Sequence, residues 1–145
     1  MTVAIDPDID FSGVAVAASR GITVSRKSFP DLIDYIKSNQ PTEVLLEAGW
    51  LNKKSNFHGG KNDLIRQSIA RSVGENHAVG KLIAQFCAHL GVHCTLVKPF
   101  HKIWKNGKIS HEEINTQLVG KGFTPLKRKT NQDERDALLI LLMWL

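Results

Sequence analysis

The sequence has few cysteines, and their surroundings match no disulfide framework or zinc motif. Its 145 residues include only Cys87 and Cys94, with no CxxC motif and no Cys/His ligand spacing around them. Two free thiols in a reducing compartment are therefore favoured over a disulfide or a zinc site. The histidines also lack metal-ligand spacing, so we expect them on the surface or in helix packing.

Long apolar runs, repeats and low-complexity linkers are also missing. No secretory h-region and no apolar stretch of membrane-spanning length occurs, so we expect a cytoplasmic protein with no membrane partner. Hydrophobic residues make up 42% and charged residues 23%, which is ordinary for a globular protein. A chain of this length predicts a single domain over residues 1–145.

Acidic residues are fewer than basic residues. Fourteen Asp and Glu stand against nineteen Lys and Arg, which gives a net charge of +5 and a sequence pI near 9.4. A basic surface favours polyanions such as nucleic acid, although many basic proteins bind none. The charge is compatible with a nucleic-acid partner without requiring one.

Short apolar runs and helical spacings alternate along the chain. They predict strands at 3–5, 13–18, 21–25, 43–47 and 92–97, and helices at about 30–38, 63–90, 110–119 and 131–145. We expect Asp63 to cap the long helix, and Ser110 with Glu113 matches a capping box. The order predicts an α/β fold, with a mixed five-stranded sheet that begins as an antiparallel meander and is flanked by helices.

Acidic residues stand at the ends of these elements. Asp6 ends the first strand, Glu47 ends the fourth, and Asp133 and Asp136 share one face at the start of the last helix. Taken singly, Asp6 could cap its turn, and acids in a first helical turn are common. Together they can converge at one sheet edge, where carboxylates repel unless cations such as Mg²⁺ or Mn²⁺ neutralise them. Two such ions about 4 Å apart can promote phosphodiester cleavage.

Three stretches carry a family resemblance, in order and over nearly the whole chain. They are IDPDIDFSGVAV at 5–16, VLLEAGW at 44–50 and DERDALLI at 133–140. The chain resembles the RuvC-type Holliday-junction resolvases of the ribonuclease H-like superfamily, whose metal-binding acids fall on Asp6, Glu47, Asp133 and Asp136. One departure is Asp8, where the family usually has Gly; it could join the metal site or only perturb the turn.

The resemblance implies a Mg²⁺- or Mn²⁺-dependent endodeoxyribonuclease with two ions per subunit and no small-molecule cofactor. Such a protein would be a homodimer that nicks two strands of a four-way DNA junction. Asp6 and Asp136 would be central ligands, Glu47 would help to hold the second ion, and Asp133 would complete the set. By position, Lys98 and Lys102 resemble the basic residues that assist at the scissile phosphate.

Two further regions could contact DNA. In the long loop at 49–62, Trp50, Lys53, Lys54 and Phe57 could stack on opened bases and neutralise phosphates, or the aromatic residues could anchor the loop on the core. The basic cluster Lys127, Arg128 and Lys129 precedes the acids of the last helix. The long helix, with Gly74 and Gly80, could form a dimer surface or face the core.

Other functions remain open at this point. Another ribonuclease H-like nuclease, acting on an RNA–DNA hybrid or structured RNA, would carry nearly the same acids. The actin-like ATPases and sugar kinases share the opening hairpin but need two lobes. A junction-binding module without catalysis is also conceivable, although the complete set of four acids argues against it.

Overall fold

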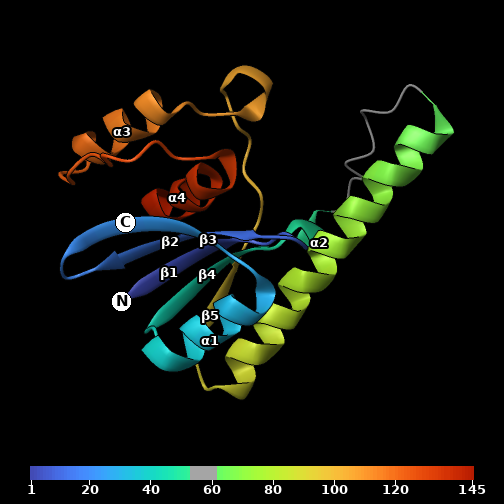
Figure 1. Cartoon of the computed structure of the whole chain (residues 1–145), viewed down its shortest axis with the longest axis horizontal. Helices are drawn as coiled ribbons and strands as arrows, with labels where there is room; N and C mark the ends of the chain where they lie inside the picture. Colours follow the sequence, from blue (N-terminus) through green and yellow to red (C-terminus); the bar gives the residue numbers. More distant parts are fainter. Residues whose placement is uncertain (53–61) are drawn as a thin grey trace.

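A five-stranded sheet, with helices on both faces, organises the molecule (Figure 1). The structure, a computed structural model, describes residues 1–52 and 62–145. The strands are β1 (Thr2–Asp6), β2 (Ser12–Ala18), β3 (Gly21–Lys27), β4 (Glu43–Glu47) and β5 (Cys94–Val97), in the order β3-β2-β1-β4-β5. Strands β1, β2 and β3 form the antiparallel meander, while β4 and β5 run parallel to β1. The predicted mixed sheet is confirmed.

The helices form two layers. They are α1 (Phe29–Asn39), α2 (Asp63–His89), α3 (His111–Gly120) and α4 (Gln132–Trp144), with short 3₁₀ turns at Gly49–Leu51 and Lys105–Gly107. Helices α1 and α2 cover one face of the sheet, and α3 and α4 cover the other (Figure 1). The N-terminal half of α2 extends past the edge of the sheet. No helix in the described ranges combines the length and apolar character needed to cross a membrane.

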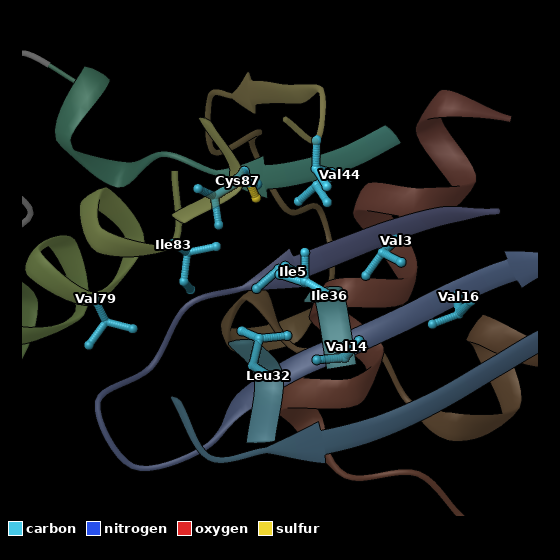
Figure 2. Packing of buried hydrophobic residues seen from close by; sticks show 12 residues of the cluster. Val3, Ile5, Val14, Val16, Leu32, Ile36, Val44, Val79, Ile83 and Cys87 are labelled. Carbon is cyan, nitrogen blue, oxygen red and sulfur yellow. The ribbon is translucent and has the colours of Figure 1, made fainter. Parts of the chain in front are cut away.

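The sheet separates two hydrophobic cores. On one side, Val3 and Ile5 of β1 pack with residues of α1 and α2, as Figure 2 shows. On the other side, Ala4 and Leu45 pack against α3 and α4. Because strand side chains alternate, β4 contributes to both cores and is buried on both faces, as its nearly continuous apolar run indicates.

The cap of α2 and the start of β5 differ from the sequence-based predictions. Asn62, and not Asp63, caps α2, because its Oδ1 accepts the N–H of Ile65 at 2.9 Å. The last strand begins at Cys94 because the N–H of Val92 is used in closing α2, by donating to the carbonyl of Cys87. The capping box of Ser110 and Glu113 is confirmed.

Two glycines allow close packing next to the acidic strand ends. A Cβ on Gly13 of β2 would lie within 2.5 Å of the Asp133 carbonyl carbon, so Gly13 lets the start of α4 approach the sheet. A Cβ on Gly80 of α2 would lie 2.5 Å from the indole of Trp50. A Cβ on Gly74 would meet no atom within 4 Å among the described residues outside its own helix backbone, so Gly74 does not mark a close approach to the core there.

Candidate metal centre

Asp6 and Glu47 lie side by side because β1 and β4 are parallel and in register. Ile5 pairs with Leu46, so the next residue of each strand ends at the same sheet edge. Alternation puts Asp6 on the side of Ala4, and Glu47 on the side of Leu45, and both of these neighbours belong to the core under α4. The two carboxylates therefore face the same helix.

Helix α4 supplies the other two predicted acids. Asn131 and Glu134 form a capping box that fixes its first turn, and Gly13 lets that turn approach β2. Asp133 and Asp136 lie three residues apart, on the helix face toward the strand ends. An N-terminal helix turn also favours negative charge.

The acids influence one another electrostatically. Burial raises the pKa of Asp6 well above its usual range; Glu47, Asp136 and Asp133 raise it further, and Lys102 opposes them. The pKa of Glu47 is also raised, first by burial and then by Asp136, again against Lys102. The structure therefore brings all four acids into one negatively charged cluster, with Asp6 nearest its centre.

Lys102 places a positive charge inside this cluster. Its Nζ lies 2.8 Å from Asp136 Oδ1, and both side chains are mostly buried. Burial alone would lower the pKa of Lys102, but the Asp136 hydrogen bond and the charges of Asp136, Glu47 and Asp6 raise it overall. Gln132 Nε2 donates to the same Asp136 oxygen at 2.9 Å. Lys102 is the internal counter-charge of the acids.

Asp133 is at the rim of the cluster. Its Oδ2 pairs with Arg26 Nε at 3.0 Å, and both side chains are more than a third exposed. Burial raises its pKa, Arg26 opposes this, and Asp8 and Asp136 add to the rise. Sequence analysis missed Arg26, which β3 carries to the site because the meander places it beside β2.

Asp8, the departure from the family pattern, shapes the turn between β1 and β2. Its Oδ1 accepts the N–H groups of Asp10 at 2.8 Å and Phe11 at 3.3 Å. Its Oδ2 accepts from Asn76 Nδ2 at 3.4 Å. These bonds give Asp8 a structural task in the turn, which is the usual role of Asp at such positions.

A cavity of about 190 Å³ opens beside Asp6 and Glu47. Its remaining walls come from the segments after β1, β4 and β5 and from α2: Pro7, Gly49, Trp50, Val73, Asn76, His77 and Pro99. Asn76 and His77 were not predicted as site residues. The spacing of Val73, Asn76, His77 and Gly80 marks one helical face, which was the available clue.

The donor chemistry suits a hard divalent cation. Asp6, Glu47 and Asp136 offer carboxylate oxygens, which Mg²⁺ and Mn²⁺ prefer, and their mutual repulsion favours a bound cation. As they stand, no three His, Cys, Asp or Glu side chains in the described part of the chain are grouped to hold one ion. Asp136 is turned toward Lys102 and Gln132 instead.

The remaining predicted residues lie around the site. Trp50 is half-buried and packs against α2, which favours the anchoring role for this aromatic residue. Lys98 is exposed in the loop after β5, and Lys127 and Lys129 are exposed before α4. Arg128 is paired with Glu134 at 2.6 Å. Lys53, Lys54 and Phe57 lie outside the described residues.

The sheet order and the helices on its two faces define the ribonuclease H-like fold in its RuvC-like form. The solved structure of T. thermophilus RuvC in complex with Holliday junction substrate matches with a TM-score of 0.56 and 19% sequence identity. The match covers 97% of this chain and 89% of that one. No family model matches the chain, and no curated protein matches it in sequence. At this identity the likeness establishes the fold.

Proposed function

We propose that the protein is a metal-dependent, structure-specific endonuclease that cleaves phosphodiester bonds in four-way DNA junctions. The observation that carries the proposal is the meeting of Asp6, Glu47 and Asp136 at one sheet edge, in a RuvC-like fold. The net charge of +5 suits a DNA partner. The RuvC structure that shares this fold is a complex with a Holliday junction substrate, so a four-way junction is the first substrate to test.

Asp6, Glu47 and Asp136 would hold two Mg²⁺ or Mn²⁺ ions, with Asp133 at the rim. When bound, the ions would supply the activation of water and the stabilisation of the leaving oxygen. The chain itself orients the acids through parallel β1 and β4 and through the capped start of α4. It also keeps them partly away from water, which strengthens their interaction with a cation.

Lys102 is the better placed of the two predicted lysines. Its ammonium lies among the acids, so a small side-chain movement away from Asp136 would bring it to a phosphate bound there. It would then donate to the charge that develops on the phosphoryl oxygens. Lys98 is exposed, and a role in phosphate binding at the edge of the site fits it better.

DNA binding outside the site would involve the exposed Lys127 and Lys129, together with Lys53, Lys54 and Phe57 of the long loop. Arg128 would act mainly through its pairing with Glu134, which holds the segment before α4. Trp50 would contact DNA only at its exposed edge, because the rest of its ring is packed on α2. The N-terminal half of α2, which extends past the edge of the sheet, would contribute to the interface of a homodimer that cuts two strands of the junction.

The test is cleavage by the purified protein with Mg²⁺, using a four-way junction, an RNA–DNA hybrid and a plain duplex. We expect paired incisions in the junction, loss of cleavage with retained binding in Asp136→Asn, and normal cleavage in Asp34→Asn. Asp34 is an exposed acid on α1 and serves as the matched control. Preferential cutting of the hybrid would indicate the other nuclease class, and binding without metal-dependent cutting would indicate a non-catalytic module.

A further inference from the structure

One face of α2 contacts the segments that follow both acid-bearing strands. The N–H of Ile9 donates to Asn76 Oδ1 at 2.9 Å, and Asn76 Nδ2 donates to Asp8 Oδ2 at 3.4 Å. Asn76 therefore bonds to the β1–β2 turn in both directions, once as acceptor and once as donor. This turn begins directly after Asp6.

The next residues on the same face contact the segment after Glu47. A Cβ on Gly49 would lie 2.7 Å from His77 Nε2, so the imidazole rests on the backbone of that segment. The Trp50 and His77 rings meet edge to face, with centroids 6.2 Å apart. One turn further along α2, Gly80 receives the indole of Trp50.

The strand ends need such support. The register pairs β1 with β4 only up to Ile5 and Leu46, one residue short of Asp6. Beyond that row, Asp6 is held by its pairing with Gly13 and by the turn, while Glu47 and Asp136 oppose its charge. Carboxylates that repel would separate unless the backbone that carries them is fixed.

We infer that Asn76 is a positioning residue, which bonds the β1–β2 turn to α2 and so fixes the Asp6 carboxylate relative to Glu47 for divalent-ion binding. The inference rests on the proposed function in that it assumes that these acids bind metal. Asn76 acts through Asp6 and contacts no ion itself. The same helix contacts the segment after Glu47 through His77 and Gly80. Helix α2 therefore supports the backbone next to both acids.

The structure suggests a test in which the hydrogen bonds are removed and then rebuilt. Asn76→Ala removes both bonds, and Asp8→Asn places two amide donors against each other. The double variant Asp8→Asn/Asn76→Asp reverses donor and acceptor between these two side chains. In it, the residue-8 carbonyl oxygen still accepts from Asp10 and Phe11, and the residue-76 carboxylate still accepts from Ile9.

Two readouts are needed. The first is the Mn²⁺ concentration that raises the melting temperature by a fixed amount above that of the same protein without metal, because this concentration scales with the dissociation constant. The second is the Mn²⁺ concentration that gives half-maximal junction cleavage. We expect each single variant to raise both by about tenfold. The double variant should return both to near the wild-type value. Gln85→Ala, an exposed residue on the opposite side of α2, should change neither.

The outcomes separate this inference from the proposed function. Single variants with wild-type Mn²⁺ dependence, or a double variant that fails to recover, would overturn the positioning role, even if the wild-type protein cuts junctions. Conversely, a wild-type protein that binds Mn²⁺ but cuts no junction would contradict the proposed function. The positioning role would then stand if the melting temperatures still followed the expected pattern.

Discussion

Asp6 carries its carboxylate into a position where burial and the charges of Glu47 and Asp136 all oppose ionisation. Its pKa in the folded protein is raised above the ordinary 3.8, and that of Glu47 is raised above 4.5. A group with a raised pKa favours folding most strongly below its unfolded pKa. That contribution is lost as the pH rises through the folded pKa. Carboxyl groups whose pKa values are raised by burial and by neighbouring charges are typical of functional sites.

The raised pKa of Asp6 predicts how the stability of the protein depends on pH. Without metal, the melting temperature of the wild-type protein should fall relative to that of Asp6→Asn as the pH rises from about 4 toward 8, because only the wild type must ionise Asp6. Each kcal/mol of difference would appear as about 2–4 °C. Melting curves of both proteins across this range would measure it, and parallel pH profiles would contradict it.

Lys102 is predicted to stabilise the metal-free protein. Lys102→Met would leave Asp136, Asp6 and Glu47 without their internal counter-charge, which should cost about 1–3 kcal/mol, less than for a fully buried pair. Because a bound cation can replace the lost charge, added Mg²⁺ should restore more stability to the variant than to the wild type. Thermal melts with and without Mg²⁺ test this; equal shifts in the two proteins would refute it.

At the scale of elements, the contact between β2 and α4 sets the place of Asp133 and Asp136. Gly13→Ala would put a methyl group into the Asp133 backbone, so α4 would have to move. We expect a loss of about 3 kcal/mol or more and a strong loss of cleavage. Gly120→Ala is the control: it lies at the end of α3 in open space among the described residues, and it should be neutral or slightly stabilising.

Chemical denaturation of both variants, with circular dichroism as the signal, gives the two free energies of unfolding. A Gly13→Ala protein as stable and as active as Gly120→Ala would show that this approach of α4 to the sheet does not fix the acids.

Much of this element arrangement could be predicted from the sequence. The apolar runs of β1 and β4 end in Asp6 and Glu47, and alternation together with parallel pairing is enough to bring these acids to one edge. The roles of Asn76 and Arg26 could not be predicted, because they depend on how α2 and β3 are placed in three dimensions. The periodicity of a helix identifies its faces but does not say which loops each face contacts.

The same limit applies to the glycines and to Lys102. Gly74 and Gly80 look alike in sequence, yet a Cβ on Gly80 would collide with Trp50, whereas one on Gly74 would meet no described residue within 4 Å. Lys98, Lys102, Lys105 and Lys108 also look alike, and only the path of the connector after β5 brings Lys102 to Asp136. Such choices are made by tertiary packing and not by local pattern.

For the molecule as a whole, the excess of positive charge predicts salt-dependent DNA binding. Lys127→Ala/Lys129→Ala should weaken junction binding and reduce the slope of log affinity against log salt by about 2, because two phosphate contacts would be lost. Arg128→Ala should act more through stability, since Arg128 is paired with Glu134. Binding titrations of the cleavage-deficient Asp136→Asn background at several salt concentrations measure the slope, and an unchanged slope would exclude both lysines as phosphate contacts.

The central claim is that side chains from β1, β4 and α4 meet to bind divalent ions. The most direct measurement is an anomalous diffraction experiment on crystals of the protein grown or soaked with Mn²⁺. The account predicts anomalous density bounded by Asp6, Glu47 and Asp136, with Lys102 displaced from Asp136. Mn²⁺ bound elsewhere, or no density at these acids at a saturating concentration, would contradict it.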